Sequence, residues 1–321
     1  MTPSDPKPGE TFLLFGELPY DLFSGDLPVR AGPNVYLDHA PHRVLGSADP
    51  SALADYVLPG YNLNPGLPNW CLRCSDSSIR PSGVAPSSQL FASVVALRLR
   101  APIAIRVEGQ FTLGQDSRSI EKPSLYHLTS PWHPRSDACY SAKDIRFAAG
   151  IARRLLDVVD PDYGRIASAA LLFSQVTTGQ SRSFQMAYLA LFAALEGLFA
   201  PKGNKAKVLA IRAAYLLSSV QTPGGFAVED WLKNEYRAGR SQLVHGTQDI
   251  VPWGGSLRPS TLKRFGRLHE IARLCILGFI SLSEGQLRSI GQASGTQLQS
   301  QLQSLAPASG PFMKGQHLWC E

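Results

Sequence analysis

The chain has 321 residues, enough for two domains, and its 44% hydrophobic and 17% charged side chains exclude an intrinsically disordered chain. Its formal net charge of +6 is concentrated in residues 141–285, which carry 18 basic and 11 acidic side chains, whereas residues 1–140 carry 11 basic and 13 acidic ones. This distribution favours a phosphate-bearing partner for the second region, although a basic surface that serves only solubility would have the same charge.

Neither secretion nor membrane insertion is indicated by the sequence. Residues 1–6 lack the basic-then-apolar pattern of a signal peptide. The apolar run 186–195 is too short to cross a bilayer and is followed by Glu196. Five cysteines, an odd count, suit a reducing compartment. We therefore expect a cytoplasmic protein without a membrane segment.

Residues 1–140 predict a small, mostly-β amino-terminal domain of unknown role. Proline, glycine, serine and aspartate are frequent there, as in the turns and loops between short strands. Strands are predicted for the short runs that are apolar or rich in valine and isoleucine, at 11–15, 35–37, 91–99, 103–111 and 125–128.

From residue 141 onward, apolar residues recur at the spacing of α-helices. Helices are predicted at 142–159, 163–176, 184–199, 205–218, 228–244 and 260–283. The third is apolar on nearly all sides, as expected of a helix in the middle of a bundle. Residues 141–285 therefore predict an all-α domain, and the Gln/Ser-rich residues 286–321 predict a mobile tail or a weakly docked helix. The fold class expected for the chain is α+β.

The stretch most indicative of function is NEYRAGRSQLVHG, residues 234–246, in which Arg240 precedes His245 by five positions. Arginine can neutralise charge that develops on a phosphate, and histidine can transfer a proton near neutral pH. Five helical steps would leave the two residues roughly 140° apart on a continuous helix. Either the helix ends between them, as Gly246 indicates, or each meets its counterpart across a two-fold axis.

A second arginine followed at similar spacing by a histidine occurs at Arg264 and His269. Here the bulky Phe265 follows the arginine, and the helix continues into an apolar stretch. We interpret this second match as coincidental, since the bare spacing is expected about once by chance in this composition.

Three segments, AALEGLF (193–199), KAKVLAIR (205–212) and YRAGRSQLVHG (236–246), resemble in order and spacing the HEPN superfamily and, within it, the Apea-like HEPN domains. The resemblance covers the chain from near residue 141 to near residue 284. It implies a HEPN-type helical bundle that forms a homodimer, with Arg240 and His245 of both protomers in one cleft. Many members are metal-independent endoribonucleases, whereas others are inactive binding domains.

The function that this resemblance implies is cleavage of RNA without a metal or cofactor. The ribose 2′-hydroxyl would attack the adjacent phosphorus, leaving a 2′,3′-cyclic phosphate and a 5′-hydroxyl, with His245 as general base or acid and Arg240 holding the transition-state charge. Such a protein would be a prokaryotic toxin or antiviral defence effector, whose amino-terminal domain senses a trigger, restrains the site or binds a regulatory protein. The alternatives are a catalytically silent HEPN-type module that binds nucleic acid or protein, and an antitoxin-like docking subunit.

Glu196 interrupts an otherwise apolar helix, and a buried carboxylate needs a partner. It could orient Arg240 or His245 in a cleft, or it could form a structural salt bridge to Lys207 or Arg212. Both alternatives are consistent with the sequence.

Four further candidates accompany the pair. Arg237 lies one turn before Arg240 and could bind phosphate or be a solvated surface charge. Ser241 could orient the arginine or contact phosphate. Three basic residues on the preceding helix could bind RNA phosphates or form a solvated face: Lys205, Lys207 and Arg212.

Cys71 and Cys74 have the two-residue gap of half a zinc site, but a second pair at a recognised spacing is missing. Ordinary reduced thiols are the alternative that we favour, and no metal site is predicted. No phosphate-binding glycine loop or nucleophile elbow is evident either.

Overall fold

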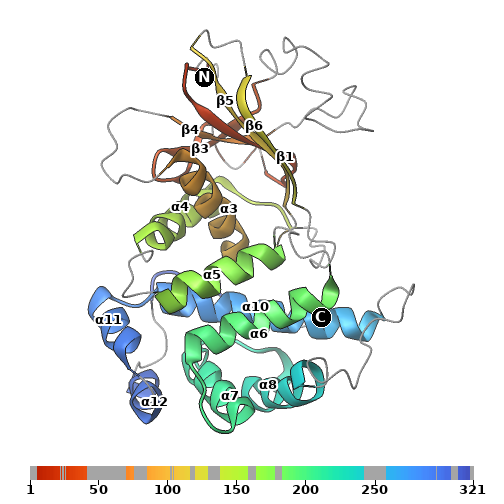
Figure 1. Cartoon of the computed structure of the whole chain (residues 1–321), viewed down its shortest axis with the longest axis vertical. Coiled ribbons are helices and arrows are strands. Elements are labelled where there is room, and N and C mark those ends of the chain that lie inside the picture. The colour runs from red at the N-terminus through yellow and green to blue at the C-terminus, as the bar shows by residue number, and fades with distance from the viewer. Residues whose placement is uncertain are drawn as a thin grey trace. The chain divides into compact units, whose positions relative to one another are not determined.

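A computed structural model of the chain describes residues 6–21, 23, 25, 27–41, 70–75, 85–101, 103, 105–115, 120–128, 138–157, 164–177, 183–241, 258–293, 295–304 and 310–318. It divides into two compact units, Met1–Leu156 and Asp157–Glu321. An antiparallel sheet with helices forms the first unit and helices form the second, which confirms the mixed α+β class (Figure 1). Helix α4 (Ala142–Asp157), expected to open the second domain, falls almost entirely in the first unit.

The first unit contains a six-stranded sheet in the order β2-β3-β4-β1-β5-β6, with every neighbouring pair antiparallel. Its strands are β1 (Thr11–Glu17), β2 (Val29–Gly32), β3 (Val35–His39), β4 (Trp70–Cys74), β5 (Arg106–Leu113) and β6 (Ile120–Leu128). Strand β1 is central, and the rings of Phe12 and Phe111 on β1 and β5 stack at 5.2 Å between centroids. The strands expected at 11–15, 35–37, 103–111 and 125–128 are confirmed within a few residues.

The strand expected at 91–99 is wrong, because these residues belong to helix α3 (Pro86–Arg100). Proline suits the first helical position, and the buried residues Leu90, Val94 and Leu97 recur at helical spacing, which outweighs the β preference of the valines. Helix α3 packs on strands β1 to β4, and it approaches β2 so closely that a Cβ at Gly32 would collide with the Ser93 hydroxyl.

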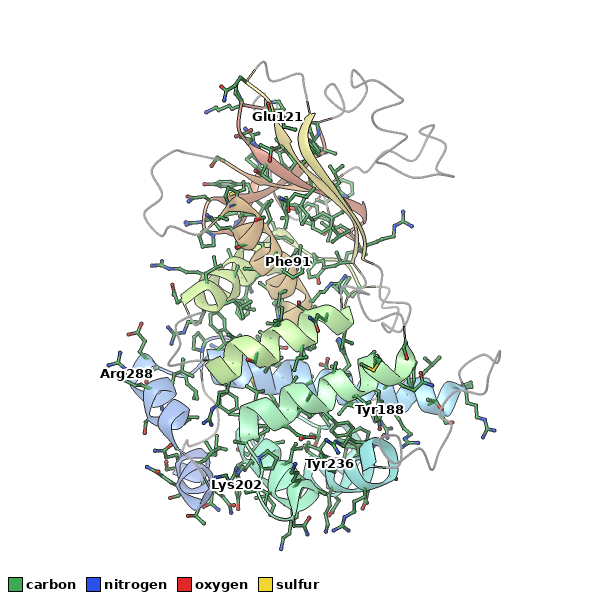
Figure 2. All side chains as sticks on the ribbon, in the orientation of Figure 1. Phe91, Glu121, Tyr188, Lys202, Tyr236 and Arg288 are labelled. Atoms are coloured by element: carbon green, nitrogen blue, oxygen red, sulfur yellow. The ribbon has the colours of Figure 1, made fainter. Side chains whose placement is uncertain are left out.

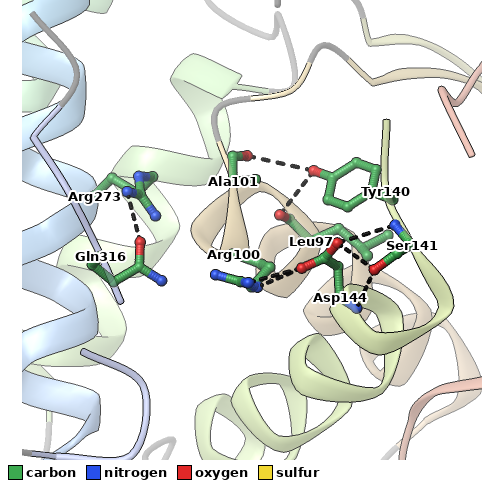
Figure 3. Close-up of polar contacts among 8 residues, drawn as sticks. All are labelled: Leu97, Arg100, Ala101, Tyr140, Ser141, Asp144, Arg273 and Gln316. Atoms are coloured by element: carbon green, nitrogen blue, oxygen red, sulfur yellow. Dashed lines mark hydrogen bonds and ion pairs between the residues drawn. The ribbon is translucent and has the colours of Figure 1, made fainter. Parts of the chain in front are cut away.

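Polar contacts join α4 to α3 in the first unit (Figure 3). The guanidinium of Arg100 lies 2.8 Å from the Asp144 carboxylate, which also accepts hydrogen bonds from the backbone and hydroxyl of Ser141 at the start of α4. The Tyr140 hydroxyl donates to the Leu97 carbonyl at 2.9 Å. Burial alone would raise the pKa of Asp144, but the hydrogen bonds from Ser141 and the charge of Arg100 hold it below its ordinary value.

A buried ion cluster joins the start of β1 to strands β3 and β4. The guanidinium of Arg73, on β4, lies 2.9 Å from the Glu10 carboxylate and 3.4 Å from that of Asp38 on β3. All three residues are at most 9% exposed. One arginine therefore balances two carboxylates inside the sheet unit.

Cys71 and Cys74 both lie on β4 and are buried. Because successive strand residues point to opposite faces, side chains three positions apart cannot ligate the same ion. Among the residues that the structure describes, no group of three or more histidine, cysteine or acidic side chains could hold a metal ion.

The second unit is built from helices α5 (Gly164–Thr177), α6 (Phe184–Phe199), α7 (Lys205–Leu216), α8 (Val228–Glu235), α10 (Pro259–Ile280), α11 (Glu284–Gln292) and α12 (Gly295–Ser304), with short helical turns η3 (Pro223–Gly225) and η4 (Tyr236–Ser241). Helix α6 contacts α5, α7, α10 and η4, which confirms its expected place in the middle of the helices. Asn204 caps α7, accepting a hydrogen bond from the Lys207 amide at 3.3 Å, as its position predicts.

The region expected to be a mobile tail or a weakly docked helix contains α11 and α12. Their junction is held by two arginines, because Arg165 donates to the Ala293 carbonyl and Arg212 to that of Gly295. Leu298 on α12 is fully buried. In the segment 310–318, Gln316 accepts a hydrogen bond from the buried Arg273 of α10 at 3.0 Å (Figure 3).

Across the described stretches of the chain, no helix combines the length and the hydropathy needed to cross a bilayer.

Candidate functional site

The predicted motif helix is α-helical only as far as Glu235, and the turn η4 that follows, Tyr236–Ser241, is π-helical. A π-helix closes its hydrogen bonds over one more residue than an α-helix, and such turns are frequent at functional sites. Tyr236, the first residue of η4, packs between α6 and α8 (Figure 2), with its ring 5.4 Å from that of Phe192 on α6. The end of the motif helix is thereby fixed against the central helix of the unit.

Arg240, near the end of η4, pairs with Glu196 of α6, with 3.0 Å between Nε and Oε1. The Tyr236 hydroxyl donates to the same carboxylate oxygen at 3.0 Å, and the guanidinium carbon of Arg240 lies 5.2 Å from the centre of the Tyr236 ring. Of the partners open to Glu196 from the sequence, the structure selects Arg240 rather than Lys207 or Arg212. We call Tyr236, Glu196 and Arg240 the Arg240 cluster.

The Arg240 cluster is accessible to solvent. The side chains of Arg240 and Glu196 are 28% and 21% exposed. Burial and the neighbouring Glu196 carboxylate raise the pKa of Tyr236 to about 12, so its hydroxyl remains a hydrogen-bond donor at neutral pH. Glu196 engages Nε of Arg240, and the guanidinium has further N–H donors on its terminal nitrogens, which suit an anion.

A second cluster of the same composition lies beside the first, and the sequence analysis missed it. Glu235, the last residue of α8, pairs with Arg264 of α10, whose Nε lies 3.0 Å from both carboxylate oxygens and whose terminal nitrogen lies 2.9 Å from Oε1. The Tyr188 hydroxyl of α6 donates to the same carboxylate. We call Tyr188, Glu235 and Arg264 the Arg264 cluster.

Gly239 of η4 makes the close approach in the Arg264 cluster possible. A Cβ at this position would collide with the Tyr188 hydroxyl and would lie 3.1 Å from the Glu235 carboxylate. Burial would lower the pKa of Arg264, but the hydrogen bonds and charge of Glu235 raise it above its ordinary value. Burial and the negative charge of Glu235 raise the pKa of Tyr188, so this hydroxyl also stays protonated.

The remaining predicted site residues are only partly brought together. His245 lies outside the described residues, as does the side chain of Ser241, the last residue of η4. Arg237 is exposed on η4, three residues before Arg240. Lys205 and Lys207 are exposed on α7, and neither contacts the Arg240 cluster within the part of the chain that the structure describes.

Arg212 does not belong to a phosphate-binding surface, and the prediction that it does is wrong. It is 3% exposed and donates to the carbonyls of Phe199 and Ala200 at the end of α6, and to that of Gly295 before α12. Burial and the nearby charge of Arg165 lower its pKa. Its guanidinium therefore connects helices and is not available to a ligand.

His269, from the second arginine–histidine match, is 2% exposed and packs 4.8 Å from the Phe173 ring, between ring centroids. His269 therefore lies on the buried side of α10, which is consistent with the interpretation that this match is coincidental. The arginine of the match, Arg264, nevertheless belongs to a polar cluster. The signal that could have found it is Glu235, an acidic residue at the end of the motif helix that requires a cationic partner once buried.

Comparison of the chain with protein-family models, with curated proteins and with solved structures finds no match. The chemistry of the site therefore rests on its own residues: two arginines, each fixed by one carboxylate and one tyrosine, on neighbouring helices of a basic region.

Proposed function

We propose that the helical unit is a metal-independent endoribonuclease of the HEPN type, in which Arg240 holds the scissile phosphate and His245 transfers protons. The observation that carries this proposal is the contact between Glu196 and Arg240 at the end of a π-helical turn, five residues before His245. A partly exposed arginine held by a carboxylate, five positions before a histidine in the sequence, supplies the two kinds of group that phosphodiester cleavage needs.

The anchoring of Arg240 matters because catalysis depends on preorganised charge. Glu196 and the Tyr236 ring restrict the guanidinium, so less conformational entropy is lost when it binds a phosphate. The carboxylate of Glu196 offsets part of the positive charge of Arg240. Arg237, exposed on the same turn, adds positive charge without a carboxylate partner among the described residues.

The reaction proposed is an internal transesterification. The ribose 2′-hydroxyl loses its proton to a general base and attacks the adjacent phosphorus, and the 5′-oxygen leaves with a proton from a general acid. His245 serves in one of these two roles, and Arg240 stabilises the charge on the phosphoryl oxygens. Because the nucleophile belongs to the substrate, the reaction is restricted to RNA and uses no metal or cofactor.

A homodimer is part of this proposal, and one surface of α6 supports it. Met186 is 60% exposed, and Ala193, two turns further along the same side, is also exposed. On the neighbouring helix α5, Leu171 is 56% exposed. Glu196 borders this uncharged strip, so a second copy that covered it would lie beside the Arg240 cluster. Both protomers would then contribute an arginine and a histidine to one groove.

The test is incubation of the purified full-length protein with end-labelled RNA in EDTA. We expect cleavage to 2′,3′-cyclic phosphate and 5′-hydroxyl ends, which Arg240→Ala and His245→Ala each abolish. Arg288→Ala, at an exposed arginine on α11, is the matched control and retains activity. A 2′-deoxy oligonucleotide should remain intact.

Two outcomes separate this proposal from its rival. If RNA binds, remains intact, and Arg240→Ala weakens binding, the helical unit is a silent nucleic-acid-binding module. Absence of both cleavage and binding contradicts an RNA site altogether. The proposed biological role, a prokaryotic toxin or defence effector regulated through the sheet unit or a protein partner, rests on the family resemblance alone.

A further inference from the structure

The Arg240 and Arg264 clusters repeat one arrangement of side chains. In each, a tyrosine hydroxyl and a guanidinium meet on the same glutamate oxygen. The parts come from four helical elements, α6, α8, η4 and α10, and α6 provides Tyr188 to one cluster and Glu196 to the other. The repetition indicates that the two arginines are held for the same purpose.

The two clusters lie at successive positions along one stripe of α6. Tyr188, Phe192 and Glu196 are spaced four residues apart, and the Phe192 ring contacts that of Tyr188 and that of Tyr236, each at 5.4 Å between centroids. Eight residues of α-helix span roughly 12 Å, so the anchoring groups Tyr188 and Glu196 are about two turns apart. The two arginines are therefore anchored at two different points along α6.

Arg264 is built to be partly accessible. Its side chain is 37% exposed, whereas that of Glu235 is only 7% exposed, so the carboxylate contacts the arginine from the interior of the unit. The contacts with Glu235 use Nε and one terminal nitrogen of Arg264, and a guanidinium has further N–H donors on its terminal nitrogens. Lys263, the preceding residue on α10, is exposed and adds positive charge.

We propose that Arg264 binds a second phosphate of the same RNA strand, distinct from the phosphate that Arg240 holds. This inference rests on the proposed function, because it takes Arg240 as the ligand of the scissile phosphate. It names the substrate class more closely, as a single strand with at least two phosphodiester groups. Arg264 sets the register of the strand and takes no part in proton transfer.

A purely structural role for Arg264, joining α8 to α10, makes different predictions. A structural ion pair would support the geometry of η4 for every substrate, whatever its length. A phosphate contact matters only to substrates that have the second phosphate, and it adds to the salt dependence of binding.

The first experiment measures binding of a 2′-deoxy-substituted RNA analogue by the full-length protein as a function of salt concentration. The slope of log Kobs against log salt should become smaller in magnitude by about 0.7 in Arg264→Gln, the value for one lost contact to a single strand. Arg288→Gln, at an exposed arginine on α11 that belongs to neither cluster, controls for loss of a surface charge and should leave the slope unchanged. The double variant Glu235→Gln/Arg264→Gln avoids a buried unpaired carboxylate and should show the same change in slope as the single variant.

The second experiment compares cleavage of a dinucleoside monophosphate, which has one phosphodiester group, with that of a longer oligoribonucleotide. In Arg264→Gln, kcat/KM should fall about tenfold or more for the longer substrate and remain unchanged for the short one. Arg264→Lys should restore part of the loss, since a lysine also binds phosphate as a point charge.

The outcomes distinguish this inference from the proposed function. An unchanged salt slope with cleavage of both substrates reduced equally overturns the phosphate contact and leaves the endoribonuclease in place. A changed slope in a protein that cleaves no RNA supports the contact and overturns the catalytic proposal. A changed slope together with a length-dependent loss of cleavage supports both.

Discussion

Arg73 in the sheet unit and Arg240 in the helical unit are both paired with glutamate, yet their surroundings differ. Arg73 contacts two carboxylates, Glu10 and Asp38, and none of the three residues is more than 9% exposed. Arg240 contacts one carboxylate, Glu196, and its side chain is 28% exposed. The same pair of residue types is therefore buried within a sheet in one unit and partly exposed to solvent in the other. Exposure and the number of carboxylates, rather than the pair itself, separate the two roles.

The largest effect on stability is expected from Arg73→Met. Removing the cation leaves two carboxylates buried without compensation, which costs about 3–5 kcal/mol. The measurement is hydrogen exchange of peptides from β1 and β4 along a urea titration, with peptides from α6 as internal reference. Arg240→Met is the matched variant and should cost about 1 kcal/mol or less, because its ion pair is partly exposed. Equal losses in the two variants would contradict the comparison.

The second-largest effect on stability is expected from Gly239→Ala, because the added methyl group collides with the hydroxyl of Tyr188, a member of the Arg264 cluster. Overpacking of this kind costs about 1–3 kcal/mol, measured as the free energy of unfolding in urea. Gly266→Ala on α10 is the control, since a Cβ there meets no atom within 4 Å and should stabilise the helix by up to about 1 kcal/mol. An unchanged free energy of unfolding in Gly239→Ala would contradict the close packing of η4 on α6.

Glu196→Gln should change stability by less than about 1 kcal/mol, because the Arg240 pair is partly exposed and glutamine still accepts the Tyr236 hydrogen bond. On the proposed function, the loss of the anchoring charge misplaces Arg240 and lowers kcat for RNA cleavage by up to about a hundredfold. Glu229→Gln in the first turn of α8 is a control that removes an equal charge. Full cleavage activity in Glu196→Gln would show that the anchoring is unnecessary.

The smallest effect concerns the pH dependence of the sheet unit. The folded-state pKa of Asp144 is held below its unfolded value of about 3.9, so its contribution to stability is fully present well above that pH and is lost as the pH falls through the lower, folded-state pKa. Asp144→Asn should therefore flatten the acid side of the stability curve of the first unit. The measurement is urea unfolding at a series of pH values. An acid limb that is unchanged in the variant would contradict the pKa shift.

Periodicity located most of the helices, because their stability depends on an apolar pattern that the chain itself displays. The expected helix 184–199 matches α6 at both ends. The same method failed at 91–99, where valines in an apolar run suggested a strand and a proline-initiated helix forms instead. β preference is a property of the surroundings as much as of the residue, so it is a weak guide when a helical pattern competes.

The candidate site was predictable only where its residues are close in sequence. Arg240 and Arg237 lie on one turn, whereas the Arg264 cluster combines α6, α8 and α10, and only tertiary packing brings these together. Arg212 has the sequence context of a surface residue, and it is buried because α12 docks against α7. The pairing of Glu196 was left open for the same reason, since several cations lay within reach along the chain.

The π-helical turn η4 makes the number of residues in the motif as important as their identity. Relative to an α-helix, a π turn accommodates one extra residue, and each residue advances an α-helix by about 100°. Deleting Ala238, which is exposed, would remove no side-chain contact of either cluster, yet it would rotate Arg240 by about that angle relative to α8. Substitutions of Ala238 should therefore be tolerated, whereas single-residue insertions and deletions in this turn would move Arg240 away from Glu196.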